Sequence, residues 1–72
     1  MKKYKFNNET KKEGNIILHR VVALRDFSEI KAGDIGGWIE KEENLSPDGD
    51  AWVYSDAMVY GDAKVYDNAV IC

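Results

Sequence analysis

The chain has 72 residues, of which 32% are charged, and a formal net charge of −3. This length allows one small domain, close to the lower limit for a self-sufficient core. It has no apolar run of about 18 residues and no apolar segment behind the N-terminal lysines, so we expect neither a membrane-spanning helix nor a secretory signal. The single cysteine, Cys72, cannot form an internal disulfide. These features predict a cytoplasmic protein.

Charge is divided unevenly along the chain. Residues 1–31 hold eight Lys or Arg and four Asp or Glu, and residues 32–72 hold two and nine. The basic half is scattered over a chain start and a turn, with no recognition helix, so direct nucleic-acid binding is not expected. The acidic half could face a basic protein groove. Many of its carboxylates stand at corners between repeats, however, where turn chemistry already accounts for them.

The first half predicts a β-hairpin and a glycine-rich connection. Residues 2–7 alternate polar and aromatic side chains, residues 11–15 carry a turn signal, and residues 16–24 are an apolar strand. We interpret residues 1–38 as an N-terminal cap that covers one end of the second part of the chain. That second part, residues 39–72, belongs to the same compact unit.

The second half contains a six-residue repeat, which predicts a β-solenoid rather than isolated elements. One small or aliphatic residue recurs at every sixth position: Ile39, Leu45, Ala51, Ala57, Ala63 and Ala69. A β-branched residue follows two positions after each of the last four: Val53, Val59, Val65 and Ile71. A small inward alanine and a stacked valine column suit a narrow prism with Gly-Asp-type corners. The alternative is a pair of β-hairpins with Gly-Asp turns.

This pattern resembles the hexapeptide-repeat, left-handed parallel β-helix proteins, in which three hexads make one triangular coil. The segments LRDF (24–27) and AGDIGGWIEKEENLS (32–46), followed by GDA-x-VY units, resemble a family of small phage and prophage proteins often labelled transferases or polymer-forming proteins. The resemblance implies an all-β fold, with a hairpin cap followed by a short left-handed β-helix. Relatives usually have many more repeats than the four clear ones here.

Aromatic and apolar side chains at outward repeat positions predict an interface. An isolated solenoid this small would show charges there, whereas Trp, Tyr and Met are enriched at contact centres. The interface core is predicted at Trp52, Tyr54, Met58, Tyr60 and Tyr66, and its acidic edges at Asp50, Asp56 and Glu43. The other interpretation is that exposed aromatic residues simply suit strands. Because the C-terminal end lacks a cap, we also expect a homodimer, and a host protein as a further partner.

The residues predict no catalytic centre, metal site or cofactor. His19 is the only histidine and stands in the middle of a strand, and Cys72 lacks a neighbour that would lower its pKa. Hexapeptide acyltransferases use a histidine base in a cleft between protomers, and such a cleft needs more coils than this chain has.

Three function classes remain open. The favoured prediction is a non-enzymatic, protein-binding module of phage or prophage origin that acts in the host cytoplasm. It would inhibit a host defence system by direct contact, as anti-CRISPR-type inhibitors do. The first alternative is an oligomer that sequesters a small anionic signalling ligand through Arg20 and Arg25. The second is a relic of a hexapeptide acyltransferase.

Overall fold

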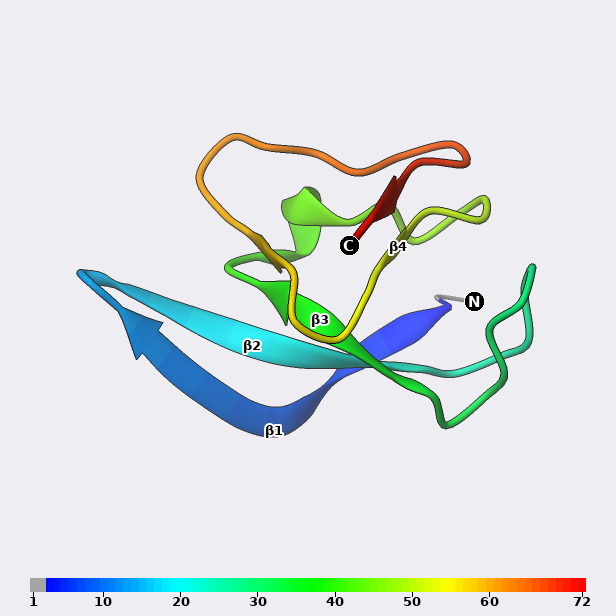
Figure 1. Ribbon diagram of the computed structural model, residues 1–72, viewed down its shortest axis with the longest axis horizontal. Coiled ribbons are helices and arrows are strands. Elements are labelled where there is room, and N and C mark those ends of the chain that lie inside the picture. Colours follow the sequence, from blue (N-terminus) through cyan, green and yellow to red (C-terminus); the bar gives the residue numbers. More distant parts are fainter. Residues whose placement is uncertain (1–2) are drawn as a thin grey trace.

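A computed structural model describes residues 3–72 as an all-β protein with one short 3₁₀ turn (Figure 1). The elements are β1 (Tyr4–Glu13), β2 (Ile16–Ala23), β3 (Ile35–Ile39), η1 (Glu42–Asn44), β4 (Trp52–Val53), β5 (Met58–Val59) and β6 (Val70–Ile71). The all-β prediction is therefore confirmed. No helix in residues 3–72 is long and apolar enough to cross a membrane.

Strands β1 and β2 form an antiparallel hairpin closed at Gly14, whose φ of +59° is a conformation that glycine adopts without strain. The first strand extends beyond residues 2–7 to Glu13, since its polar second half still pairs with the apolar β2. The register shifts between Phe6 and Thr10, and Asn8 at that point has a φ of +76°. The shift is a bulge, which bends the hairpin.

Strand β3 joins the hairpin to the repeat region. It pairs antiparallel with β2 and parallel with β5, so one mixed sheet has the order β1-β2-β3-β5. The sequence predicted a glycine-rich connection here, but residues 35–37 belong to this strand. A Cβ at Gly37 would collide with the carbonyl oxygens of Tyr54 and Ala57, so this strand approaches the next segment more closely than any side chain permits.

The repeat region forms three parallel ladders, and each ladder pairs residues of an earlier segment with residues of a later one. We call the earlier segment the first winding (residues 38–53) and the later segment the second winding (residues 58–71). The ladder pairs are Trp38 with Met58, Ile39 with Val59, Leu45 with Val65, Trp52 with Val70, and Val53 with Ile71. In the ladder of β4 and β6 the partners are three hexads, or 18 residues, apart along the chain. In the other two ladders the partners are 20 residues apart. Parallel pairing excludes the antiparallel hairpins that were the alternative for this region.

The core lies inside the two windings and beneath the hairpin. Its repeat positions are fully or almost fully buried: Ile39, Leu45, Ala51, Val53, Ala57, Val59 and Val65. Tyr4, Val21 and Ala23 contribute to it from the hairpin. The later repeat positions Ala63 and Ala69 are exposed because no strand lies beyond the second winding within residues 3–72.

The burial of Trp52 corrects the sequence prediction, which placed this side chain on the outer surface. Trp52 is only 1% exposed and packs edge-on against Phe27, with ring centroids 5.3 Å apart. The segment after β2 folds over this part of the first winding and turns an outward position into a core position. Gly36 provides the space that the indole ring occupies, since a Cβ at this position would lie 2.6 Å from the ring.

Candidate functional site

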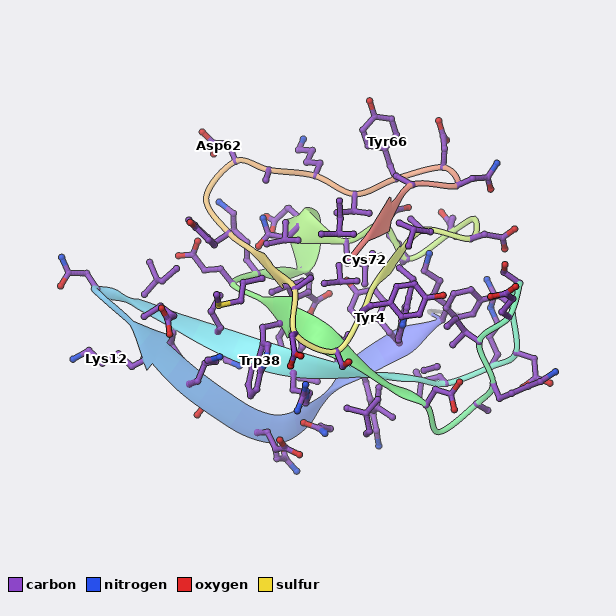
Figure 2. The ribbon with its side chains drawn as sticks, in the orientation of Figure 1. Tyr4, Lys12, Trp38, Asp62, Tyr66 and Cys72 are labelled. Atoms are coloured by element: carbon purple, nitrogen blue, oxygen red, sulfur yellow. The ribbon has the colours of Figure 1, made fainter. Side chains whose placement is uncertain are left out.

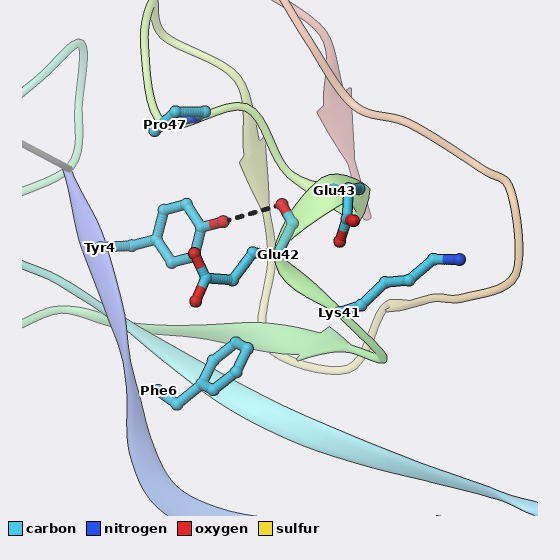
Figure 3. A pocket seen from close by; sticks show the side chains of 6 residues that line it. All are labelled: Tyr4, Phe6, Lys41, Glu42, Glu43 and Pro47. Atoms are coloured by element: carbon cyan, nitrogen blue, oxygen red, sulfur yellow. Dashed lines mark hydrogen bonds between the residues drawn. The ribbon is translucent and has the colours of Figure 1, made fainter.

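A pocket lies where β1 meets the loop after β3, and we call it the junction pocket (Figure 3). Its volume is about 700 Å³. The lining combines two aromatic rings, a proline, one ammonium and two carboxylate groups: Tyr4, Phe6, Lys41, Glu42, Glu43 and Pro47. An apolar floor with a few charged groups at the rim suits a small amphipathic molecule.

Tyr4 forms the inner wall of the junction pocket and holds the loop in place. Its hydroxyl donates to the Leu45 carbonyl oxygen at 2.8 Å and lies 3.1 Å from that of Glu42 (Figure 3). Burial, assisted by the negative charges of Glu42 and Glu43, raises the pKa of Tyr4 to about 12. The phenol is therefore neutral at physiological pH and acts as a hydrogen-bond donor rather than as a base.

Phe6 connects the junction pocket to the only histidine. Its ring stacks on the His19 imidazole with centroids 4.5 Å apart and an angle of 10° between the planes. His19 is half-buried and pairs with Thr10 and Ile39 in the neighbouring strands. An imidazole therefore lies directly behind the aromatic floor of the pocket.

The rim of the junction pocket is acidic and open to solvent. The side chains of Glu42 and Glu43 line it together with Lys41, whose ammonium lies 4.0 Å from a carboxylate oxygen of Asp62. Two carboxylates against one ammonium give the rim a negative balance, which favours a cationic group on a ligand. An aromatic face such as that of Phe6 also attracts cations.

Asn44 fixes the loop that carries the rim residues. Its amide oxygen accepts from the backbone nitrogens of Glu40 (3.1 Å) and Lys41 (2.9 Å), and its amide nitrogen donates to the carbonyls of Gly61 (3.2 Å) and Ala63 (2.8 Å). The side chain is completely buried and ties the first winding to the second. The sequence analysis missed this residue; an amide side chain directly before the inward repeat position Leu45 was the available signal.

Lys3 is a second buried polar residue that the sequence analysis missed. Its ammonium donates to the carbonyls of Asp48 (3.0 Å) and Gly49 (3.3 Å) and lies 5.1 Å from the Phe27 ring centroid. Burial lowers the pKa of Lys3, and the charge of Arg25 lowers it further. Lys3 thus fastens the start of the chain to the corner at residues 48–49.

The structure disperses the residues predicted as an interface. Trp52 is buried and Tyr54 is half-buried, whereas Met58, Tyr60 and Tyr66 are 39%, 53% and 60% exposed. The three acidic residues Asp50, Asp56 and Glu43 are also exposed, and Glu43 lines the junction pocket. Tyr66 points outward from the second winding, away from the core (Figure 2). A binding role for this set stays a prediction, but the set does not form one continuous surface centred on Trp52.

The two arginines predicted to bind an anionic ligand have partners within the chain. Arg20 donates to the carbonyls of Gly36 and Ser55, and its guanidinium lies 4.6 Å from the Trp38 ring centroid. The Arg25 guanidinium lies 5.6 Å from the Phe27 ring centroid. Arg20 therefore positions β2 against the first winding. Sequestration of an anion stays a prediction, with Arg20 already engaged in holding the fold.

Comparison with known proteins gives an informative match. The chain is similar to a protein of Escherichia coli (strain K12) named "Uncharacterized acetyltransferase YdcK", with 36% identity over 64 residues. The match covers 75% of this chain and 19% of the relative, so the chain spans about a fifth of that protein's length. No protein-family model matches the chain.

This match corrects two predictions from the sequence. A non-catalytic phage module that inhibits a host defence system is wrong, because the relative is named for an enzymatic activity and the match carries no link to phages or defence systems. The prediction that the chain is not an enzyme is wrong for the same reason. The sequence analysis discounted catalysis because the chain has one histidine and few repeats. The match is to a longer protein, to which these two limits do not apply.

Proposed function

We propose that this chain is a hexapeptide-repeat unit of the acetyltransferase type, in which the two windings begin a left-handed parallel β-helix. The observation that carries the proposal is the 36% identity over 64 residues with a protein named as an acetyltransferase. The transferred group would be acetyl from a thioester donor, and the acceptor would be a small molecule.

The ladders support the structural part of this proposal. Trp52 and its partner Val70 are separated by three hexads, which is the length of one triangular coil. The separation in the other two ladders is slightly longer, as between Trp38 and Met58. The two additional residues lie between Leu45 and Val53, which are eight residues apart, whereas their partners Val65 and Ile71 are six apart. Pro47 from this segment lines the junction pocket. An insertion that departs from a regular coil and forms a pocket is a typical place for function.

Acetyl transfer requires a base and a place for the acceptor. The acceptor atom attacks the thioester carbonyl, the sulfur leaves with the electron pair of the carbon–sulfur bond, and the acceptor loses a proton. We assign the junction pocket to the acceptor and the carboxylates of Glu42 and Glu43, which line it, to the proton transfer from acceptor to leaving thiolate. The negative balance at Glu42 and Glu43 also favours an amine as acceptor.

The proposal is tested by incubating the chain with acetyl-CoA and a panel of small amines. We expect release of free thiol and an acetylated amine detectable by mass spectrometry. The double variant Glu42→Gln, Glu43→Gln should greatly reduce thiol release while leaving the thermal unfolding midpoint close to that of the parent chain. Lys12→Gln, at the exposed end of the hairpin, serves as the matched control and should retain activity. Absence of thiol release together with absence of acetyl-CoA binding would contradict the proposal.

A further inference from the structure

A second, smaller hollow adjoins the junction pocket, and we call it the side hollow. Its volume is about 170 Å³, and it is lined by Tyr4, Lys5, Phe6, Leu24 and Glu42. Tyr4, Phe6 and Glu42 also line the junction pocket. The two hollows therefore meet along these shared residues and form one site with two parts.

The walls of the side hollow are mainly apolar. Tyr4 and Phe6 supply two aromatic rings, and Leu24 is a leucine that is 40% exposed. The backbone nitrogen of Leu24 donates to the Lys3 carbonyl oxygen at 2.6 Å, which holds Leu24 beside the start of β1. Lys5 is exposed, and its side chain starts on the opposite face of β1 from the two rings, because side chains alternate along a strand.

The size of the side hollow fits a single six-membered ring. An apolar protein cavity of about 150 Å³ takes up benzene, which is close to the volume found here. Aromatic rings also pack favourably against the faces and edges of other rings. Between Tyr4, Phe6 and Leu24 we therefore expect an aromatic group of the ligand.

A carboxylate stands at the boundary between the two hollows. Figure 3 shows the Glu42 side chain reaching between the rings of Tyr4 and Phe6. Glu43 adds a second carboxylate on the side of the junction pocket. A ligand group at this boundary is favoured when it is cationic, and the face of the Phe6 ring favours the same charge. The cation must lie a short distance from the aromatic group, because Glu42 lines both hollows.

We infer that the two hollows together bind an arylalkylamine, with its ring in the side hollow and its ammonium beside Glu42. The inference deepens the proposed function, on which it rests only for the role of this amine as the acetyl acceptor. A simple alkylamine leaves the side hollow empty. An arylalkyl carboxylate of the same shape places an anion beside Glu42. Both therefore bind more weakly than the arylalkylamine.

Titration of the isotope-labelled chain with phenethylamine, n-propylamine and phenylpropionate tests the inference. Amide chemical shifts report binding, and acetyl-CoA is left out of this experiment. We expect phenethylamine to bind at least about tenfold more tightly than either of the other two compounds. Its shifts should be confined to β1, Leu24 and residues 41–47, which surround the two hollows.

Leu24→Gln separates the two hollows, because Leu24 lines the side hollow and is not part of the junction-pocket lining. It should weaken phenethylamine binding by about threefold or more and leave n-propylamine binding within about twofold. Ile17→Gln is the matched control, since Ile17 is similarly exposed (46%) and pairs with Lys12 towards the far end of the hairpin. Both Kd values should stay within about twofold in this control.

Equal binding of phenethylamine and n-propylamine, equal binding of phenylpropionate, or an unchanged phenethylamine Kd in Leu24→Gln would each overturn the inference, whether or not the chain transfers acetyl groups. Thiol release from acetyl-CoA is measured separately with the same two amines. Preferred binding of phenethylamine without thiol release would support the ligand class and contradict only the proposed transfer.

Discussion

Single buried polar residues decide how the loop around the junction pocket is held. Asn44 bonds two backbone donors and two backbone acceptors, and of these the Glu40 nitrogen also donates to the Val59 carbonyl. Tyr4 and Lys3 do the same for the carbonyls of residues 45 and 48–49. In a chain with so small a core, these contacts replace apolar burial that a longer protein would have.

Asn44→Ala should lower the free energy of unfolding by about 2–4 kcal/mol, because it leaves several backbone groups without their partner. Urea denaturation followed by Trp fluorescence measures this change. Asn68→Ala, at an exposed corner of the second winding, is the control and should stay within about 0.5 kcal/mol of the parent chain. Equal effects of the two substitutions would show that the Asn44 contacts do not hold the loop.

The raised pKa of Tyr4 predicts a loss of folding stability at alkaline pH. Its pKa is about 12 in the folded chain against 10.0 for an ordinary tyrosine, so its contribution is complete below pH 10 and is lost as pH rises towards 12. Lys3 acts in the opposite sense, since its lowered pKa makes the folded state relatively more stable as pH approaches 10.5. The difference between the parent chain and Tyr4→Phe isolates the tyrosine.

Tyr4→Phe should cost about 1 kcal/mol near pH 7 through the lost hydrogen bond. Its disadvantage relative to the parent chain should shrink between pH 10 and pH 12, because phenylalanine has no proton to lose. Denaturation curves at pH 7, 10 and 11 measure both effects. Tyr66→Phe, at an exposed tyrosine, should show neither of them. A constant difference at all pH values would contradict the assigned pKa.

At the level of elements, the six-residue spacing was sufficient to predict the inward positions from Ala51 to Val59. Ala51, Val53, Ala57 and Val59 are buried as the repeat requires, because alternation within a strand is a local property. The same alternation rule predicted that the Trp52 side chain lies on the outer surface of the repeat region. Its burial depends on the segment around Phe27 folding back over the winding, which is a contact between distant parts of the chain that a local pattern does not contain.

Strand β3 illustrates the same limit. Gly36 and Gly37 indicated a turn or connection, yet they form the strand that pairs with the hairpin on one side and with the second winding on the other. The glycines are needed for close packing rather than for turning, which only the neighbours of the strand reveal. The junction pocket was likewise beyond prediction, since β1 and the loop at residues 41–47 are brought together by this pairing.

Gly37→Ala should therefore be strongly destabilising, by more than about 2 kcal/mol. The added Cβ would meet two backbone carbonyls, those of Tyr54 and Ala57, and backbone cannot move aside as a flexible side chain can. Gly14→Asn is the control, because that position is open and asparagine tolerates its positive φ. Thermal unfolding that is unchanged in Gly37→Ala would show that β3 does not pack as described.

At the scale of the whole molecule, the hairpin and the repeat region join around the junction pocket. Strand β2 pairs with β3, the Tyr4 hydroxyl donates to the Leu45 carbonyl, and the Lys3 ammonium donates to the carbonyls of residues 48–49. The pocket lies at this junction, beside Tyr4 and Phe6. The proposed acceptor site therefore depends on the packing of the hairpin against the first winding.

The proposed function depends on the parallel stacking of the two windings. The most direct measurement is a nuclear Overhauser spectrum of the isotope-labelled chain. We predict backbone contacts between Trp52 and Val70 and between Trp38 and Met58, which are partners in the parallel ladders. Contacts between Val53 and Val59 in an antiparallel pattern, without those between the ladder partners, would contradict the stacking of the windings.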